Sequence, residues 1–366
     1  MARIHEIGLV DIMGKLPEIN NLDTGYFEQR RDDLFLCALG FEDRCCAIPE
    51  IAAGIRKYYA GTSLCFEYST NSEDNEANRI RLTAALNKFS GAVHSIPCDT
   101  EDFAGKFKTW LQAIVKSGGF CRVTFDVSAC SSRLILTIVC AALKEDIDLT
   151  ILYSEANVYH PTKEEYDDNL KDQMKSDRGL GIEQGVGSVI FSSEHPGVRS
   201  DQLAEAVIIF PTFKSERTRA VLAAIDDSLL EEPSERVVWI VGKPHHQDNY
   251  WRADAMRDLN KIQARDKCVE VCTFDYRRTL ECLDRIYASW DCYYNVTISL
   301  IGSKMQNVGA ALFWYMRQNV SMVFAAPESY KAKGYSEGRG ACWRLSLGAT
   351  EELRRVLDSV GQLKLC

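Results

Sequence analysis

One pattern of residues occurs twice along this chain, and it limits the fold more than any other feature. Residues 124–134 align without a gap on residues 295–305, which places Ser128 on Ser299. Upstream, residues 34–41 align on residues 206–213, and each is an apolar run that ends at a Phe before a polar turn. The elements keep the same order in both copies, so the sequence predicts an internal duplication.

Each copy alternates short apolar runs, rich in β-branched residues, with amphipathic stretches. Such runs are typical of parallel strands buried on both faces, and the alternation indicates helical crossovers between them. We therefore predict an α/β chain of two tandem Rossmann-like units, each with a doubly wound parallel sheet. The expected strands are 34–39, 63–68, 92–97, 121–127 and 149–154 in the first copy, and 206–211, 237–242, 268–273, 294–300 and 320–326 in the second. The expected helices of the first copy are 45–60, 75–89, 101–117 and 131–145.

A length of 366 residues suits two domains better than one core. The polar, glycine-punctuated segment between the copies is typical of a connector, in which we expect a helix at 163–175 and a short hairpin. The predicted organisation is an N-terminal appendage (1–30), a first repeat (31–161), a connector (162–205), a second repeat (206–348) and a C-terminal helix and tail (349–366).

Composition limits the compartment, the cofactors and the ligands that we expect for this chain. No apolar run reaches the roughly 18 residues that a membrane helix needs, and the first residues lack the features of a secretory signal. We therefore expect a cytoplasmic protein that makes no membrane contact. The 14 cysteines are scattered without the spacing of a metal site, so free thiols, no metal and no cofactor are expected. A net charge of −9 argues against a protein that coats long nucleic acid, but it leaves room for a small anion in a local basic pocket.

The loop after the fourth strand is the first place to expect a ligand. Open α/β sheets bind ligands beyond the carboxyl ends of their strands, near the point where the strand order reverses. Small residues that open a helix leave backbone N–H groups for an anion, and a following Arg or Lys adds a charged contact. The alternative is ordinary helix capping beside a solvated basic side chain. The predicted ligand-binding residues are Ser128, Ser131, Ser132, Arg133, Ser299, Gly302, Ser303 and Lys304, with Phe41 and Phe213 of the first-strand loops shaping the pockets.

Catalytic signals are sparse. The sequence contains no nucleophile elbow, no Walker loop and no paired-histidine zinc motif. Asp126 and Arg44 are the candidates for an activated site in the first copy, and Thr297 takes the place of Asp126 in the second. His245 and His246 are candidates for a general acid or base, although adjacent side chains of an extended chain point apart and make a poor chelate.

The fourth-strand loops resemble the signature of CARF domains, the Rossmann-like sensors of CRISPR and related antiviral systems. That signature is a strand, an Asp or Ser, a turn rich in Ser, Thr or Gly, and a Lys or Arg that opens a helix. A chain with two such units is also similar to SAVED domains, which are read as two fused CARF-like halves. The resemblance implies a cyclic oligonucleotide ligand bound across a pseudo-twofold axis, and a separate effector or complex subunit as partner. The residues that carry it are Asp126, Ser128, Ser132, Arg133, Ser299, Gly302, Ser303 and Lys304.

Three functions fit these observations. The first is a binder or sensor of a small phosphorylated ligand, a nucleotide or cyclic oligonucleotide, in a prokaryotic antiviral defence or signalling assembly. The second is an enzyme that acts on nucleotides, such as a phosphodiesterase or a glycosidic-bond hydrolase. The third is a scaffold subunit of a defence complex whose pockets have degenerated.

Overall fold

The chain folds into two α/β units, and the second is inserted into the first. The computed structural model describes residues 4–70, 73–118, 121–173, 183–184, 188–231, 234–326, 329–330 and 335–365. Unit 1 comprises Met1–Thr162 together with Lys331–Cys366, and unit 2 comprises Lys163–Tyr330. The chain therefore leaves unit 1, forms unit 2, and returns.

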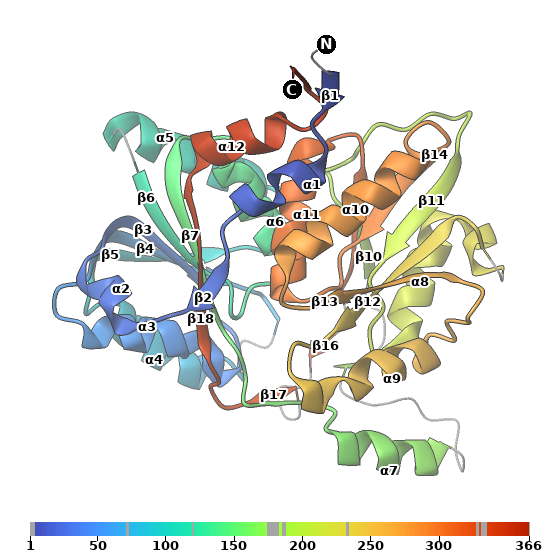
Figure 1. The fold of residues 1–366 in the computed structure, drawn as a ribbon. Coiled ribbons are helices and arrows are strands. Elements are labelled where there is room, and N and C mark those ends of the chain that lie inside the picture. The colour runs from blue at the N-terminus through green and yellow to red at the C-terminus, as the bar shows by residue number, and fades with distance from the viewer. Residues whose placement is uncertain are drawn as a thin grey trace. The chain divides into compact units, whose positions relative to one another are not determined.

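Unit 1 contains a seven-stranded sheet in the order β2-β18-β7-β6-β3-β4-β5 (Figure 1). The five strands predicted for the first copy are confirmed, and they pair in parallel. Helix α3 packs with α4, and α5 packs with α6, as right-handed crossovers on two faces of a sheet require. These elements are β3 (Arg31–Ala38), α3 (Ala47–Gly54), β4 (Tyr59–Glu67), α4 (Glu76–Leu86), β5 (Ser90–Pro97), α5 (Phe103–Gly118), β6 (Cys121–Asp126), α6 (Ser132–Ala142) and β7 (Ile147–Ser154), with the short helix η2 (Asp43–Cys46) before α3.

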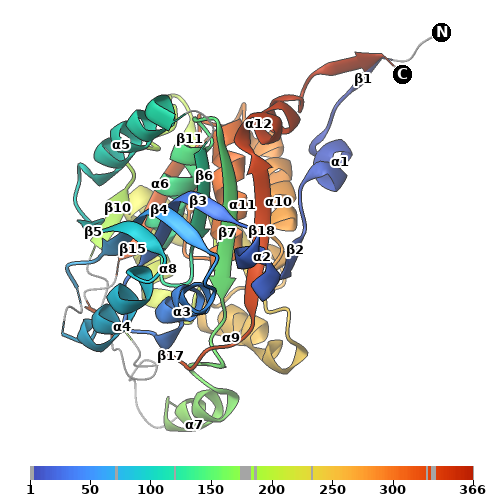
Figure 2. The same ribbon diagram turned by 90° about the vertical axis from the view of Figure 1, so that its left-hand side faces the viewer.

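Both ends of the chain complete this unit. Strand β18 (Cys342–Ala349) lies antiparallel between β7 and β2 (Ile19–Asn21), as Figures 1 and 2 show. The predicted boundary of the second repeat at residue 348 is therefore wrong, because β18 pairs with the first sheet. The predicted appendage 1–30 is also part of the unit, since β2 joins the sheet and Phe27 is fully buried in its core. The remaining elements are β1 (Ile4–Glu6), α1 (Leu9–Ile12), η1 (Met13–Lys15), α2 (Thr24–Glu28), β8 (Val158–Tyr159), β17 (Ser336–Glu337), α12 (Thr350–Asp358) and β19 (Leu363–Leu365).

Unit 2 repeats the same strand order. Its six-stranded sheet runs β10-β15-β14-β11-β12-β13, and the five strands predicted for the second copy are confirmed as parallel neighbours. An antiparallel strand, β10, flanks the last parallel strand just as β18 does in unit 1. The elements are α7 (Lys163–Gln173), β9 (Glu183–Gln184), β10 (Ser188–Phe191), β11 (Ala204–Ile209), α8 (Ser215–Ile225), η3 (Asp227–Leu230), β12 (Val237–Lys243), η4 (Gln247–Asn249), α9 (Trp251–Leu259), β13 (Lys267–Cys272), α10 (Tyr276–Trp290), β14 (Tyr294–Ser299), α11 (Lys304–Met316), β15 (Ser321–Ala326) and β16 (Ser329–Tyr330).

The segment predicted as a connector belongs to unit 2. Its expected helix is confirmed as α7. The expected hairpin is wrong, because β9 pairs with β16 and β10 pairs with β15, both far along the chain. The glycine-rich stretch 178–187 lies largely outside the described residues.

The shared topology places the same switch point in each unit. In both sheets the first and fourth parallel strands are neighbours, β3 with β6 and β11 with β14, and the strand order reverses between them. Ligands of doubly wound sheets bind beyond the carboxyl ends of the strands at this point. Matching strand order is what an internal duplication would produce, and the duplication itself stays a prediction. None of the helices in the described part of the chain is long and apolar enough to cross a membrane.

Candidate functional site

In unit 1 the loop after the fourth strand runs from β6 into α6. Ser131 caps the helix, because its Oγ accepts a hydrogen bond from the backbone N–H of Leu134 at 3.2 Å. The backbone N–H of Ser131 donates to the Tyr68 hydroxyl at 2.7 Å. Arg133 is half-buried in the first turn and donates to the Thr100 carbonyl oxygen at 3.5 Å. Capping thus accounts for Ser131, while Arg133 places a positive charge at the start of the helix.

Asp126 ends β6 and is almost entirely buried. One carboxylate oxygen, Oδ1, accepts hydrogen bonds from Ser128, 3.0 Å from its backbone N and 2.5 Å from its Oγ. The Ser128 hydroxyl also accepts from the backbone N–H of Ser154 at 2.8 Å, which ties the loop to β7. The other oxygen of Asp126, Oδ2, is buried and has no hydrogen-bond partner among the described residues. Burial raises the pKa of Asp126 to about 7, against the opposing effects of Ser128 and Arg44.

Arg44 lies on residues 40–46, which we call the first-strand loop of unit 1 because they follow β3. Its guanidinium forms an ion pair with Glu42 at 2.8 Å, and both side chains are at least nine-tenths buried. The Arg44 side chain also approaches the Tyr153 hydroxyl at 3.5 Å and lies over the Tyr159 ring. Burial lowers the pKa of Arg44, but the Glu42 carboxylate outweighs it and keeps the pKa well above its ordinary value. The two residues predicted as catalytic candidates, Asp126 and Arg44, are therefore both buried in unit 1, and the charge of Arg44 acts to lower the pKa of Asp126.

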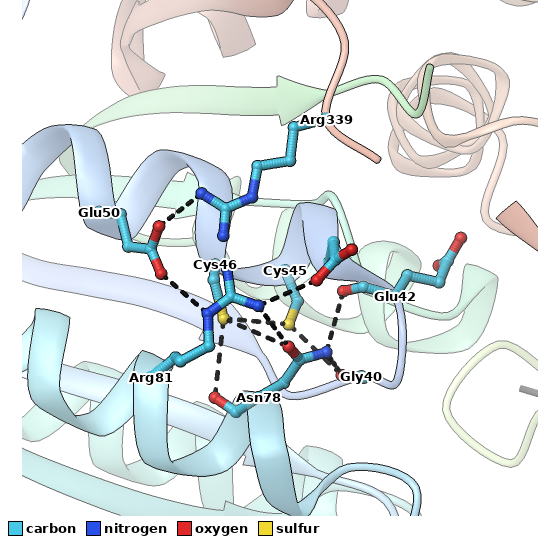
Figure 3. Close-up of polar contacts among 9 residues, drawn as sticks. Gly40, Glu42, Cys45, Cys46, Glu50, Asn78, Arg81 and Arg339 are labelled. Carbon is cyan, nitrogen blue, oxygen red and sulfur yellow. Dashed lines mark hydrogen bonds and ion pairs between the residues drawn. The ribbon is translucent and has the colours of Figure 1, made fainter. Parts of the chain in front are cut away.

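Side chains of α4 and η2 fix the first-strand loop from one side (Figure 3). Asn78 donates from Nδ2 to the carbonyl oxygens of Gly40 at 2.9 Å and Glu42 at 3.3 Å. Cys45 Sγ lies 3.4 Å from the Gly40 carbonyl oxygen and 3.6 Å from Cys46 Sγ. The interaction with Cys46 and burial raise the pKa of the Cys45 thiol well above its usual range, so it stays protonated. These thiols are structural, and the cysteines that the structure describes are free, as predicted.

The returning C-terminal segment holds the same loop from the other side. Ser336 donates a hydrogen bond from Oγ to the Glu42 carboxylate. Arg339 pairs with Glu50 at 2.5 Å, on the helix that follows the loop (Figure 3). The Tyr335 ring meets the Phe41 ring edge-to-face, with centroids 5.5 Å apart. Residues far apart in sequence thus contact Glu42, Phe41 and the helix that follows the loop.

In unit 2 the corresponding loop leads from β14 into α11. Ser303 and Gln306 form a reciprocal cap, in which Ser303 Oγ accepts from the Gln306 backbone at 3.2 Å and Gln306 Oε1 accepts from the Ser303 backbone at 2.9 Å. Lys304 is the first helical residue and is half-buried. The helix caps match Ser131 with Ser303, whereas the ungapped alignment matches Ser132 with Ser303. The ungapped alignment is therefore wrong by one residue at the helix start and by two at the strand end, since β6 ends at Asp126 and β14 at Ser299.

Two buried polar atoms at this edge of unit 2 have no hydrogen-bond partner among the described residues. They are Ser299 Oγ, in a fully buried side chain, and Gln306 Nε2, in a side chain only 2% exposed. Gly302 lies against both Gln306 and Phe210, since a Cβ there would meet Gln306 Oε1 at 3.0 Å and the Phe210 ring at 3.1 Å. Buried polar atoms without partners are rare in folded proteins, and they are expected where a ligand supplies the missing bonds.

The predicted pocket aromatics are packed within their own units. Phe41 packs against Tyr335 in unit 1. Phe213 belongs to a small hydrophobic cluster with Tyr166 and Trp251, and the Arg252 guanidinium lies 4.6 Å from its ring centroid. Their role in binding a ligand stays a prediction.

His245 and His246 do not point apart. Their ring centroids are 3.9 Å apart, and His245 also packs against the Phe274 ring at 4.5 Å. The expectation of divergent side chains was wrong because the pair lies in a bend between β12 and η4 instead of in an extended strand.

Sequence reasoning missed several residues that the structure brings to these sites. Gln306 could have been found, because a Ser followed three residues later by Gln is a capping signature. Glu42 was seen only as part of a polar turn, and its pairing with Arg44 depends on backbone geometry. Ser336 and Arg339 carry no local signal, since they reach the first-strand loop only through the return of the chain to unit 1.

No protein-family model matches the chain, and no curated protein is similar to it. Among solved structures, the chain is similar to the crystal structure of the cytoplasmic domain of a prokaryotic cation chloride cotransporter. That likeness covers 81% of this chain and 95% of the other, with 8% sequence identity and a TM-score of 0.24. A TM-score this low supports no inference about fold or function.

Proposed function

We propose that this chain binds a small phosphorylated ligand, a nucleotide or cyclic oligonucleotide, at the carboxyl edges of its sheets. The observation that carries the proposal is the recurrence of one arrangement at both switch points. After each fourth strand a serine caps a helix, and a basic side chain stands in its first turn, Arg133 in unit 1 and Lys304 in unit 2. Helix N-termini attract anions, and a neighbouring cation strengthens the interaction.

The charges favour unit 2 as the principal phosphate site. There the loop after β11 ends in Lys214, which precedes α8, and Lys304 begins α11 after the neighbouring strand β14. The unpartnered Ser299 Oγ and Gln306 Nε2 offer further hydrogen bonds. In unit 1 the arginine of the first-strand loop, Arg44, is paired with Glu42.

The resemblance of the fourth-strand loops to CARF and SAVED domains supports the finer form of the proposal. It would make the ligand a cyclic oligonucleotide signal of prokaryotic antiviral defence, read in the cytoplasm and passed to a separate effector. The two-unit architecture fits a signal with repeated phosphates.

Equilibrium binding tests the proposal. The purified protein is titrated with ATP, cyclic di-AMP, a cyclic triadenylate and inorganic pyrophosphate by calorimetry, after native mass spectrometry has identified any nucleotide that copurifies. The double variant Arg133→Ala, Lys304→Ala should bind the best member at least about tenfold more weakly, because each substitution removes a charged hydrogen bond to phosphate. The matched control, Lys57→Ala with Lys108→Ala, removes two exposed charges elsewhere and should bind as the wild type does.

Each failure has its own meaning. Unchanged affinity in the double variant would show that the fourth-strand loops are not the site. If none of the four compounds binds and no nucleotide copurifies, the chain is not a nucleotide sensor. A polypeptide that copurifies in place of a nucleotide would favour the scaffold function.

A second candidate function, an enzyme that acts on nucleotides, is favoured by Asp126. A buried carboxyl group with a pKa of about 7 and an unpartnered oxygen is suited to donate or accept a proton near neutral pH. Turnover of the same nucleotide panel would reveal it, and Asp126→Asn should then abolish product formation while binding persists. Absence of product with every nucleotide would exclude this function.

A further inference from the structure

Unit 2 contains a groove along one face of α8, which we call the α8 groove. Its volume is about 230 Å³, and it is lined by α8, η3, the first half of β12 and the residues around the end of α9. Three lining residues follow one another at helical spacing, Ser215, Arg219 and Leu222. The helix rises about 10 Å between the first and the last of them, so the groove is elongated.

The floor of the groove is apolar. The Trp239 side chain, on β12, is partly exposed there and packs against the core cluster of unit 2. Leu222 of α8 and Leu259 of α9 also line the groove. An apolar side chain of a ligand would be removed from water against these three residues, which favours its binding.

One end of the groove is basic. Arg219 lies in the second turn of α8, which begins after the carboxyl end of β11. Lys261 follows Asn260, whose Nδ2 donates to the carbonyl oxygen of Thr212 at 2.7 Å in the loop after β11. Both basic side chains are exposed, and neither forms an ion pair within the described part of the chain. This end, toward the carboxyl edge of the sheet, is suited to a carboxylate.

The other end of the groove is acidic. Glu231 follows η3 and precedes β12, and Asp266 is the residue directly before β13. These strands are parallel neighbours, so both carboxylates lie toward the amino edge of the sheet. Neither forms an ion pair with another residue that the structure describes. From Arg219 to the end of α8 at Ile225 the helix rises about 9 Å, so the two charged ends are on the order of 10 Å apart.

We propose that the α8 groove binds a short peptide with free ends, about three residues long and with an apolar side chain in the middle. Three extended residues span about 10 Å, which matches the separation of the charges. The carboxylate lies at Arg219 and Lys261, the ammonium group at Glu231 and Asp266, and the central side chain against Trp239. A free amino acid does not fit, because its two charges share one carbon atom. This inference goes beyond the proposed function, since it assigns a second ligand to a separate place in unit 2.

Blocked peptides test whether both charged ends are read. Glycyl-leucyl-glycine should bind the full-length protein in calorimetry, and its N-acetylated and C-amidated forms should each bind at least about fivefold more weakly. Free leucine should bind at least about tenfold more weakly. Equal affinity for the free and the blocked forms, tighter binding of leucine, or no binding of the tripeptide would overturn the proposal.

The central side chain is tested at Trp239. Triglycine should bind at least about tenfold more weakly than glycyl-leucyl-glycine, because it buries no apolar side chain. The leucine peptide should change the tryptophan fluorescence of the wild type, and the change should vanish in Trp239→Phe while calorimetric binding persists. A fluorescence change that survives this substitution would overturn the placement of the peptide.

A variant and a blocked ligand together isolate the contact at Arg219. Arg219→Gln should weaken the free peptide at least about fivefold but leave the affinity of the C-amidated peptide unchanged, since that form has no carboxylate to lose. Arg56→Gln removes an exposed arginine of unit 1 and should bind both forms as the wild type does. Equal weakening of the two forms by Arg219→Gln would overturn the assignment of the carboxylate.

Lys261 separates binding from stability. Its φ is 55°, the only positive φ of a non-glycine residue in the described part of the chain, at a position after α9 where glycine is usual. In Lys261→Gly the midpoint of urea unfolding should therefore be equal or higher, while glycyl-leucyl-glycine binds at least about threefold more weakly. Unchanged affinity, or weaker binding together with lower stability, would overturn the role of Lys261 in binding.

The peptide and the nucleotide proposals fail independently. Glycyl-leucyl-glycine should bind the double variant Arg133→Ala, Lys304→Ala as tightly as it binds the wild type, because neither residue lines the α8 groove. Loss of peptide binding in that variant would overturn the placement of the peptide in the groove.

Discussion

Asp126 shows how burial raises the pKa of a single carboxyl group. Its side chain ends the fourth strand, accepts both hydrogen bonds from Ser128 on one oxygen, and leaves the other oxygen without a partner among the described residues. Desolvation disfavours the carboxylate more than Ser128 and Arg44 favour it, so the pKa rises from 3.8 to about 7. The folded protein therefore binds this proton more tightly than the unfolded chain does.

This proton makes the stability of unit 1 depend on pH. Because the folded pKa lies above the unfolded one, the stabilising contribution is present at acid pH and is lost as pH rises from about 4 through about 7. The free energy of unfolding of the wild type should fall over that range, relative to Asp126→Asn, by an amount on the order of a few kcal/mol. Urea unfolding at about pH 4.5 and about pH 8 measures the difference, with the exposed Glu101→Gln as control. Parallel pH profiles for wild type and Asp126→Asn would contradict it.

At the residue scale, the sequence indicates which polar residues follow the strands better than it indicates which side chains they meet. Asp126 and Arg44 could be named because strand ends and the turns after them are legible in the pattern. The pairing of Arg44 with Glu42 could not, since both lie in one turn whose backbone decides which side chains meet. The shift between Ser132 and Ser303 was missed for a different reason: an ungapped alignment applies one offset to strand and helix, whereas the strand ends and the helix caps of the two units are related by different offsets.

At the scale of the elements, the first-strand loop of unit 1 is held by side chains that are distant from it in sequence. Little of it is regular secondary structure beyond the short helix η2, and its shape depends on side chains from α4 and from the returning segment 335–339. Ser336 of β17 donates to the Glu42 carboxylate in a buried position. The loop that holds Arg44 is thus coupled to the strand pair β8–β17, through which the chain passes into and out of unit 2.

Removal of that hydrogen bond should loosen the loop. In Ser336→Ala the amides of residues 40–46 should exchange with solvent hydrogen about tenfold faster, because a buried hydrogen bond to a charged group contributes roughly 1.5 kcal/mol or more. Hydrogen–deuterium exchange with mass spectrometry measures this peptide by peptide. Ser346→Ala, an exposed serine of β18, is the control and should leave the loop unchanged. Identical exchange in both variants would show that the loop is held without Ser336.

The strands that were predicted have a local sequence pattern, whereas the strands that were missed depend on partners distant in sequence. All ten parallel strands were predicted, because most are short apolar runs that alternate with amphipathic stretches. Strands β2 and β18 were missed, because their place in the sheet depends on partners distant in sequence, such as Cys342 opposite Ser154. Neither β2 nor β18 has a continuous apolar run, so no local pattern assigns them to one sheet or the other.

At the scale of the whole molecule, the insertion of unit 2 between the two segments of unit 1 predicts how each part of the chain folds. Unit 2 enters and leaves through β8 and β17, which are antiparallel neighbours with Tyr159 opposite Ser336. Tyr159 and Ser336, which flank the inserted unit, therefore lie one strand spacing apart, about 5 Å. A short loop could join them at small entropic cost. The returning segment, in contrast, supplies β18, without which β2 and β7 have no shared neighbour.

These facts predict opposite outcomes for two deletions. Replacement of residues 163–330 by a short glycine-serine linker should leave a unit 1 that folds cooperatively and keeps the pH dependence assigned to Asp126. Truncation after residue 330 should leave unit 1 unfolded, because it removes the strand between β2 and β7 along with α12. Circular dichroism and thermal unfolding of both variants measure the outcomes. A folded truncation would mean that β18 is dispensable, and an unfolded excision would mean that unit 1 needs unit 2 to fold. We therefore expect that unit 1 folds without unit 2 when its two segments are joined by a linker. We expect that unit 1 does not fold when its C-terminal segment is removed.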